Sequence, residues 1–298
     1  MQQLAGLYPP IPTPFDEQGK LDLHWLEANL ARWSAQPLDG VVMPGSNSEA
    51  AFLTAEERVA IWQVCADVLK GSGKRLIAGT GAETTAETIH FTTTAAELGA
   101  TAALVLPPYF YKPSLTHEVL VEHYQAVAAA SPIPLLVYNV PAFTGVDFAL
   151  PTLLKLAEHT QIVGIKDSSS NIVKMAEVLA QRPDFQVFAG TGSALLPFLS
   201  IGAAGGIMAL ANVAAFPLRR LYDAFRERRM EDARKLQMAV VALNSALTTR
   251  FGVSGLKYAM DQTGFYGGPV RRPLLPLSAQ ARAEFDRILA EVHPLLAG

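Results

Sequence analysis

Eight short apolar segments recur along the chain, and this repetition constrains the fold more than any other feature. They cover residues 5–10, 39–45, 75–81, 102–108, 134–141, 162–167, 185–190 and 205–210. Each segment is a continuous apolar run without polar alternation, which is the pattern of a strand buried on both faces. Strands of this kind need cover on both sides of the sheet.

Helical patterns fill the gaps between these segments. We expect helices at about residues 23–35, 55–70, 85–98, 116–130, 151–159, 171–181, 193–201 and 216–228. Two of them begin with a capping-box pattern, Thr54 with Glu57 and Thr84 with Glu87, in which hydroxyl and carboxylate satisfy each other's backbone donors. Gly99 fits a helix C-terminus.

Eight strands that are each followed by a helix predict an α/β fold of the (β/α)8 TIM barrel type. Right-handed crossovers leave few other ways to bury so many two-sided strands, and an open doubly wound sheet is the alternative. After about residue 229 the alternation stops, and we expect further helices at 230–249, 255–262 and 278–296. The chain is therefore expected to divide into a catalytic barrel, 1–229, and a C-terminal helical extension, 230–298.

The composition argues against several classes of protein. Half of the 298 residues are hydrophobic, the net charge is −3, and no basic stripe suggests nucleic acid or anionic lipid as a partner. The single cysteine, Cys65, precludes an internal disulfide and is expected to be a small buried side chain. The six histidines form no metal-binding pattern. We find no signal peptide and no membrane span, so a cytoplasmic location is expected.

In barrel enzymes the active site lies at the C-terminal ends of the strands, and two of the predicted strand ends stand out. Period-two alternation places Leu136 and Tyr138 on one face of the fifth strand, and Ile162, Gly164 and Lys166 on one face of the sixth. If both faces point inward, the phenol and the amine are neighbours. We expect Gly164 to leave space beneath the lysine stem.

Lys166 and Tyr138 have a chemical interpretation and a plainer one. Burial disfavours the charged form of a lysine, and a neutral amine can form a Schiff base with a keto group while a nearby phenol relays protons. In the plainer interpretation Lys166 reaches solvent or pairs with Asp167, and Tyr138 is a rim aromatic whose hydroxyl meets water.

The segment PGSNSE (44–49) ends the second strand. Its Gly45, Ser46, Asn47 and Ser48 offer backbone and side-chain donors that suit a carboxylate. A polar loop of ordinary turn-forming residues is the alternative.

Three of these segments together resemble a known family. YNVPAFTG (138–145), GIKDSSSN (164–171) and PGSNSE resemble the dihydrodipicolinate synthase / N-acetylneuraminate lyase family of pyruvate-dependent class I aldolases, and the likeness continues through GGIMALANV (205–213) and the C-terminal tail. The resemblance implies a (β/α)8 barrel with C-terminal helices. It also implies a homo-oligomer, either a tetramer or a dimer, and a reaction that needs no cofactor because it uses a covalent lysine Schiff base.

The resemblance implies a role for each matching residue. The Schiff-base lysine falls on Lys166 and the catalytic tyrosine on Tyr138, and the turn that binds the pyruvate carboxylate falls on Ser46 and Asn47. Ile207 corresponds to the backbone near the enamine.

The sequence departs from the family in three ways, of which two bear on the substrate and one on the mechanism. Gly190 and Phe143 are expected substrate contacts, but Phe143 stands where synthases usually carry an arginine, and no carboxylate follows Gly190 as in sialic-acid lyases. Phe110, between Tyr109 and Tyr111, stands where many members have a tyrosine that serves the neighbouring subunit. Tyr111 or a water is a possible substitute.

These features suggest a particular reaction and two alternatives. The chain looks most similar to 4-hydroxy-2-oxoglutarate aldolases, so we expect it to cleave or form a 4-hydroxy-2-oxo acid, with pyruvate and an aldehyde as its small-molecule partners. The first alternative is dihydrodipicolinate synthase, which condenses pyruvate with aspartate semialdehyde. The second is a barrel that binds a keto acid without catalysis.

Overall fold

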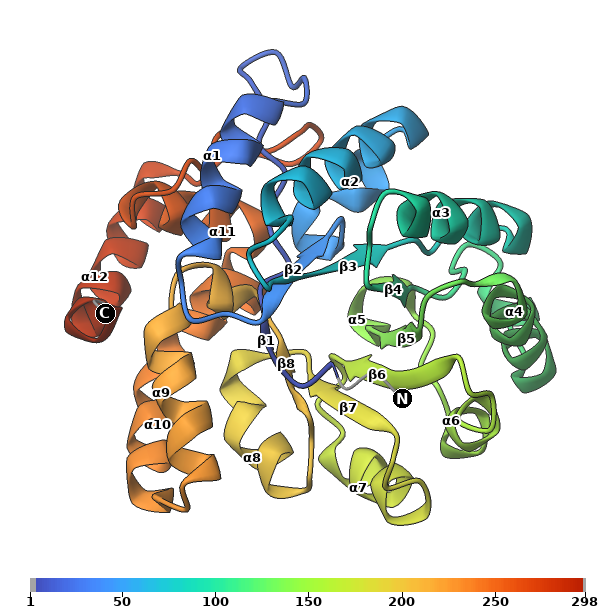
Figure 1. Cartoon of the computed structure of the whole chain (residues 1–298). Helices are drawn as coiled ribbons and strands as arrows, with labels where there is room; N and C mark the ends of the chain where they lie inside the picture. Colours follow the sequence, from blue (N-terminus) through green and yellow to red (C-terminus); the bar gives the residue numbers. More distant parts are fainter. Residues whose placement is uncertain (1–3, 297–298) are drawn as a thin grey trace.

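The computed structural model describes residues 4–296 and shows a barrel of parallel strands surrounded by helices (Figure 1). The strands within these residues are β1 (Gly6–Tyr8), β2 (Gly40–Met43), β3 (Arg75–Gly79), β4 (Ala102–Val105), β5 (Leu135–Asn139), β6 (Ile162–Asp167), β7 (Gln186–Ala189) and β8 (Gly205–Ile207). Each strand lies within a segment that the sequence predicts as a strand. The (β/α)8 prediction is therefore confirmed.

The strands form a closed ring. Neighbours pair in parallel in the order β1-β8-β7-β6-β5-β4-β3-β2. Backbone hydrogen bonds close the ring between β1 and β2, where Asp39 N–H donates to Leu7 O over 3.0 Å and Val42 N–H donates to Pro9 O over 2.9 Å. Because all strands run the same way, their C-terminal ends gather at one mouth of the barrel.

Helices cover the outside of the barrel (Figure 1). They are α1 (Leu23–Ser34), α2 (Ala55–Leu69), α3 (Thr85–Glu97), α4 (His117–Ala130), α5 (Pro141–Thr144), α6 (Leu150–Leu156), α7 (Ile172–Gln181), α8 (Leu195–Ser200), α9 (Ala215–Arg226), α10 (Met230–Ser245), α11 (Gly252–Gln262) and α12 (Ala279–Leu296). The four-residue α5 was not predicted from the sequence. A π-helical turn, Ala246–Arg250, links α10 to α11.

The predicted capping box is complete at α2, whereas at α3 one of its two bonds is found. At the start of α2, Thr54 Oγ1 accepts the Glu57 N–H over 3.2 Å and Glu57 Oε2 accepts the Thr54 N–H over 3.0 Å, which completes the capping box. At the start of α3, Thr84 Oγ1 accepts the Glu87 N–H over 3.1 Å, the first of the two bonds. Gly99 follows the end of α3 with a φ of 99°, a conformation that glycine adopts without strain.

Two apolar layers form the core. The inner layer fills the barrel and contains Leu4, Tyr8, Val42, Ile77, Ala102, Leu104, Leu136, Tyr138, Val140, Val163, Phe188 and Ile207. The outer layer lies between strands and helices and includes Ile162. The prediction that Ile162 faces inward is wrong, because the register between β5 and β6 shifts at Leu135/Leu136 and brings Val163 to the inside instead.

The C-terminal segment packs against the barrel at several places. α10 packs against α9 (Figure 1), and α11 packs against the turn Ser46–Ser48 that follows β2. Lys257 of α11 forms a buried ion pair with Glu49, with 2.7 Å between Nζ and Oε1. Part of the C-terminal extension beyond residue 229 therefore reaches the mouth of the barrel.

Candidate active site

Tyr138 and Lys166 lie side by side at the mouth of the barrel. They occupy the ends of β5 and β6 and are direct partners in the parallel register. Lys166 Nζ lies 4.0 Å from the centroid of the Tyr138 ring. The exposed fractions of Lys166 and Tyr138 are only 3% and 5%. The juxtaposition that alternation predicts is therefore present.

Lys166 carries no counter-ion in the part of the chain that the structure describes. None of the ion pairs found between residues 4 and 296 involves this lysine. The plainer interpretations, in which it reaches solvent or pairs with Asp167, do not describe this structure. Asp167 instead bonds to Asn139 and Ser169 on the other side of the sheet.

Gly164 has a different role from the predicted one. A Cβ at this position would lie 2.1 Å from the Gln186 carbonyl oxygen of β7. The backbone of the neighbouring strand, rather than the lysine stem, therefore excludes a side chain here. Gly190 is constrained in the same way, since its Cβ would lie 2.5 Å from the Asp167 carbonyl oxygen of β6.

The turn after β2 brings Ser46 to the tyrosine. The hydroxyl groups of Ser46 and Tyr138 lie 3.2 Å apart. Ser48 stabilises the turn, since its hydroxyl accepts the Gly45 N–H over 2.9 Å and donates to Ile11 O over 2.5 Å. Ser46 and Asn47 begin a single 3₁₀ turn, so their backbone N–H groups have no helical partners and are available to an anion.

A cavity of about 570 Å³ opens at this mouth. Its wall includes three predicted site residues, Ser46, Tyr138 and Phe143. The other four predicted site residues are not on the wall: Asn47, Lys166, Gly190 and Ile207. Ile207 is fully buried at the end of β8 within the inner layer. Lys166 is in contact with the ring of Tyr138, which itself lines the cavity.

Arg58 is a cavity residue that the sequence reasoning missed. Among the described wall residues it is the only lysine or arginine. Its guanidinium donates to Ala50 O over 3.0 Å and lies 5.2 Å from the centroid of the Phe91 ring. Burial lowers the pKa of Arg58. Helices that follow barrel strands begin near the mouth of the barrel. Arg58 lies in the first turn of the helix predicted after Thr54, and this position in the sequence could have identified it as a candidate site residue.

Two exposed aromatic side chains lie on loops at the mouth. Phe143, in α5, is 71% exposed and lines the cavity. Phe110 is 73% exposed, whereas its neighbour Tyr109 lines the cavity. Tyr111, considered above as a substitute hydroxyl, is also exposed and lines a second cavity instead, of about 410 Å³.

Three further observations concern the cysteine, possible metal ligands and possible membrane-spanning helices. Cys65 is buried as predicted, and burial raises the pKa of its thiol. Between residues 4 and 296, no three His, Cys, Asp or Glu side chains gather as metal ligands would. No helix in the same range combines the length and hydropathy that a bilayer-spanning segment needs.

A parallel barrel with an amine beside a phenol at the ends of its strands is the architecture of a class I aldolase, and comparison with known proteins supports this class. The chain belongs to the dihydrodipicolinate synthetase family, whose model matches residues 3–292.

Similar proteins extend over almost the whole chain. A 4-hydroxy-tetrahydrodipicolinate synthase of Methanococcoides burtonii is 35% identical over 292 residues, covering 96% of this chain and 98% of the relative. The crystal structure of a dihydrodipicolinate synthase from Bacillus anthracis superposes with a TM-score of 0.92 at 28% identity, covering 97% of this chain and 99% of that one. A pyruvate complex of the chloride-inhibited synthase from Acinetobacter baumannii has the same TM-score at 30% identity, with coverage of 97% and 99%.

Family membership makes the chain an enzyme, a pyruvate-dependent class I lyase. Enzymes of this family act through a lysine Schiff base with pyruvate and use no cofactor. The narrower resemblance to 4-hydroxy-2-oxoglutarate aldolases finds no support in these relatives, which are named as synthases.

Proposed function

We propose that Lys166 forms the Schiff base with pyruvate and that Tyr138 moves the protons. The amine attacks the keto carbon, the carbinolamine loses water, and loss of a methyl proton gives an enamine whose carbon attacks an aldehyde. Hydrolysis then frees an open-chain 4-hydroxy-2-oxo acid and restores the lysine; where the aldehyde carries an amino group, that amine can instead attack the imine carbon, expel the lysine and close a ring. The observation that carries this proposal is the register pair, which places the amine 4.0 Å from the ring centroid of a potential acid–base group.

The turn after β2 is the proposed site for the pyruvate carboxylate. The free backbone N–H groups of Ser46 and Asn47 supply donors, and the Ser46 hydroxyl also lies within hydrogen-bond reach of Tyr138. One turn therefore contacts the substrate carboxylate and the proposed proton relay together. Gly190 and Ile207, at the ends of the seventh and eighth strands, would pack against the bound keto acid.

As the aldehyde we propose aspartate semialdehyde, which makes the chain a 4-hydroxy-tetrahydrodipicolinate synthase. The names of the relatives support this choice. Arg58 also supports it, because it places a cation on the cavity wall for the carboxylate of the aldehyde, although Phe143 replaces the usual arginine.

A second reaction is favoured by Phe143 itself. Its ring gives the cavity an apolar surface where the resemblance leads us to expect a bidentate donor. An apolar ring in place of the expected arginine fits an enzyme that cleaves a 4-hydroxy-2-oxo acid to pyruvate and an aldehyde. The two reactions share the enamine and the Schiff base of pyruvate, which the cleavage reaction passes through in the reverse order. They differ in direction and in the aldehyde.

A coupled assay with aspartate semialdehyde and glyoxylate as competing acceptors separates the two reactions. The synthase proposal predicts a higher kcat/KM for aspartate semialdehyde. It also predicts that Arg58→Leu raises the KM for this aldehyde about tenfold without changing the KM for pyruvate. Arg234→Leu, which removes an exposed arginine of α10, is the matched control. Preference for glyoxylate together with an inert Arg58→Leu variant would support the cleavage reaction instead.

A further inference from the structure

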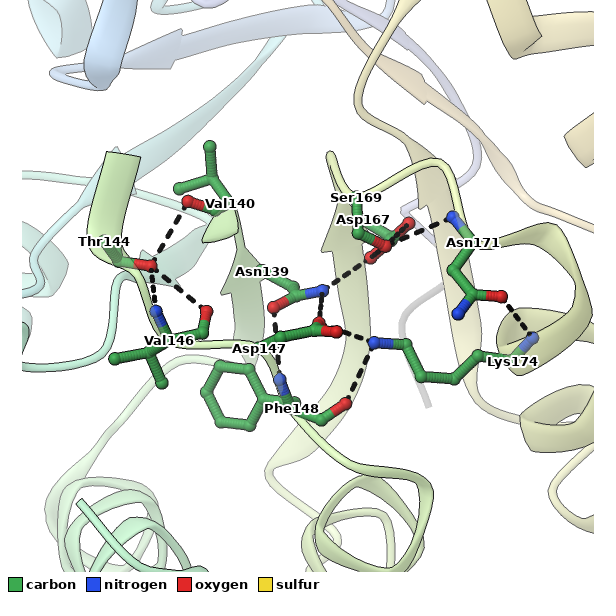
Figure 2. Close-up of polar contacts among 10 residues, drawn as sticks. All are labelled: Asn139, Val140, Thr144, Val146, Asp147, Phe148, Asp167, Ser169, Asn171 and Lys174. Atoms are coloured by element: carbon green, nitrogen blue, oxygen red, sulfur yellow. Dashed lines mark hydrogen bonds and ion pairs between the residues drawn. The ribbon is translucent and has the colours of Figure 1, made fainter. Parts of the chain in front are cut away.

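Asn139 and Asp167 follow Tyr138 and Lys166 by one residue on each strand, and they too are partners in the register. Alternation turns their side chains to the outside of the barrel wall, where Figure 2 shows them pointing toward one another. Asn139 Nδ2 donates to Asp167 Oδ1 over 2.7 Å. A side-chain bond therefore joins the two strands directly behind the proposed catalytic pair.

The same amide also binds the loop that follows α5. Asn139 Nδ2 donates to Asp147 Oδ1 over 2.8 Å, and Asn139 Oδ1 accepts the Phe148 N–H over 3.3 Å. Figure 2 shows Asn139 between this loop and β6. One fully buried side chain thus connects the ends of β5 and β6 with the loop that leads back from Phe143.

The charges around Asn139 explain why an amide is needed. Lys174 Nζ donates to Asp147 Oδ1 over 2.6 Å, and Ser169 Oγ donates to Asp167 Oδ1 over 2.8 Å. Two carboxylates therefore converge with only one ammonium between them. An asparagine offers two N–H donors without charge and gives one to each carboxylate. An aspartate here would add a third negative charge, and an alanine would remove a donor from the fully buried Asp167.

We propose that Asn139 is a positioning residue: it fixes Tyr138 relative to Lys166 by joining β5 and β6, and it fixes the loop that follows α5, the short helix that contains Phe143. This inference rests on the proposed Schiff-base function. Proton transfer requires hydrogen-bond distances, so a displacement of about 1 Å at the tyrosine costs on the order of a hundredfold in rate.

Exchange of the pyruvate methyl protons with solvent, followed by NMR, tests the proposal. Exchange requires enamine formation but no aldehyde, so it reports on Lys166 and Tyr138 alone. We expect Asn139→Ala to lower kcat for exchange at least tenfold, while the KM for pyruvate changes less than threefold and borohydride still traps pyruvate on Lys166. The KM should hold because the turn at Ser46 and Asn47 is untouched.

Ser169→Ala is the matched control. Ser169 and Asn139 donate to the same oxygen of Asp167 at nearly the same distance, but only Asn139 belongs to β5 and so joins that strand to β6. The control should exchange at the wild-type rate. An equal fall in the exchange rate in both variants, or an unchanged rate in Asn139→Ala, would overturn the positioning role.

Two further measurements keep the outcomes distinct. If wild-type protein is not trapped on Lys166, the proposed function fails regardless of any Asn139 variant. If Asn139→Ala does not fold, Asp147→Ala replaces it, because the Asp147 side chain is half exposed and its loss leaves the bond between Asn139 and Asp167 in place. This variant should raise the KM for the aldehyde about threefold or more and spare pyruvate exchange. An unchanged aldehyde KM would contradict the claim about the loop.

Discussion

Two buried lysines in this protein have opposite surroundings. Lys257 of α11 is 1% exposed, lies 2.7 Å from Glu49 Oε1, and donates to Pro269 O over 2.7 Å. Lys166 is almost as deeply buried, but its nearest recorded partner is the face of Tyr138. A buried ammonium is costly unless it is paired, so the paired lysine suits a structural role and the unpaired lysine suits chemistry.

Lys174 of α7 has the same kind of surroundings as Lys257. It lies eight positions after Lys166 in the sequence and is also buried, yet it donates to Asp147 Oδ1 over 2.6 Å and to Phe148 O over 3.0 Å. Two of the three buried lysines in the described range therefore each contact two oxygen atoms. This difference singles out Lys166 without reference to any relative.

The substitution Lys166→Met is expected to have the largest effect on activity. We expect kcat/KM to fall about a thousandfold or more, because the proposed Schiff base forms on this amine. The free energy of unfolding should stay the same or rise, since the substitution removes an unpaired amine from the core. Urea denaturation beside the coupled assay measures both quantities. A large loss of stability would mean that Lys166 is a structural lysine after all.

The opposite outcome is expected for Lys257→Met. This substitution leaves Glu49 buried without its counter-ion, so the free energy of unfolding should fall by about 3–5 kcal/mol. The double variant Lys257→Met, Glu49→Gln removes both charges and should recover part of the loss. If the single variant is as stable as wild type in a urea titration, the pair does not hold the C-terminal segment to the mouth.

His123 is a buried basic side chain of another kind, an imidazole. Its Nδ1 bonds to Thr85 Oγ1 over 2.9 Å, its Nε2 has no partner among the described residues, and burial lowers its pKa to about 4. Between pH 6.5 and 4 the unfolded chain then binds more protons than the folded chain, so stability falls as the pH falls. From pH 7 to pH 5 we expect a loss of about 2 kcal/mol from this group. Denaturation of His123→Gln at both pH values checks this, and an unchanged pH dependence would refute it.

The smallest expected effect concerns Phe143, which lies at the mouth but away from the amine. Phe143→Arg should raise the relative kcat/KM for acceptors with a distal carboxylate about tenfold, or about 1.4 kcal/mol of transition-state discrimination. Trapping of pyruvate on Lys166 should be nearly unchanged. Loss of trapping in a folded variant would show that position 143 supports the lysine site.

The barrel and the central pair were predictable because both follow from local periodicity. Continuous apolar runs indicate two-sided strands, and alternation within two of them places Tyr138 and Lys166 on the inner face. The register shift that turns Val163 inward was not predictable, since a single extra residue leaves no trace in composition.

Contacts between distant segments were also beyond the sequence. Lys257 and Glu49 are far apart in the chain, and only the packing of α11 against the turn after β2 brings them together. Arg58 was missed because a basic residue in the first turns of a helix is usually solvated. Asn139 was read as part of a strand end, and its role depends on Asp147 and Asp167, which reach it only in the folded barrel.

Borohydride reduction in the presence of pyruvate, followed by peptide mass spectrometry, tests the central claim most directly. The account predicts one stable pyruvyl adduct, located on Lys166, and none on Lys174 or Lys257, whose amines are engaged by carboxylates. Lys166→Met should abolish the adduct. An adduct on another lysine of the folded protein, or no adduct under conditions in which the enzyme turns over, would contradict it.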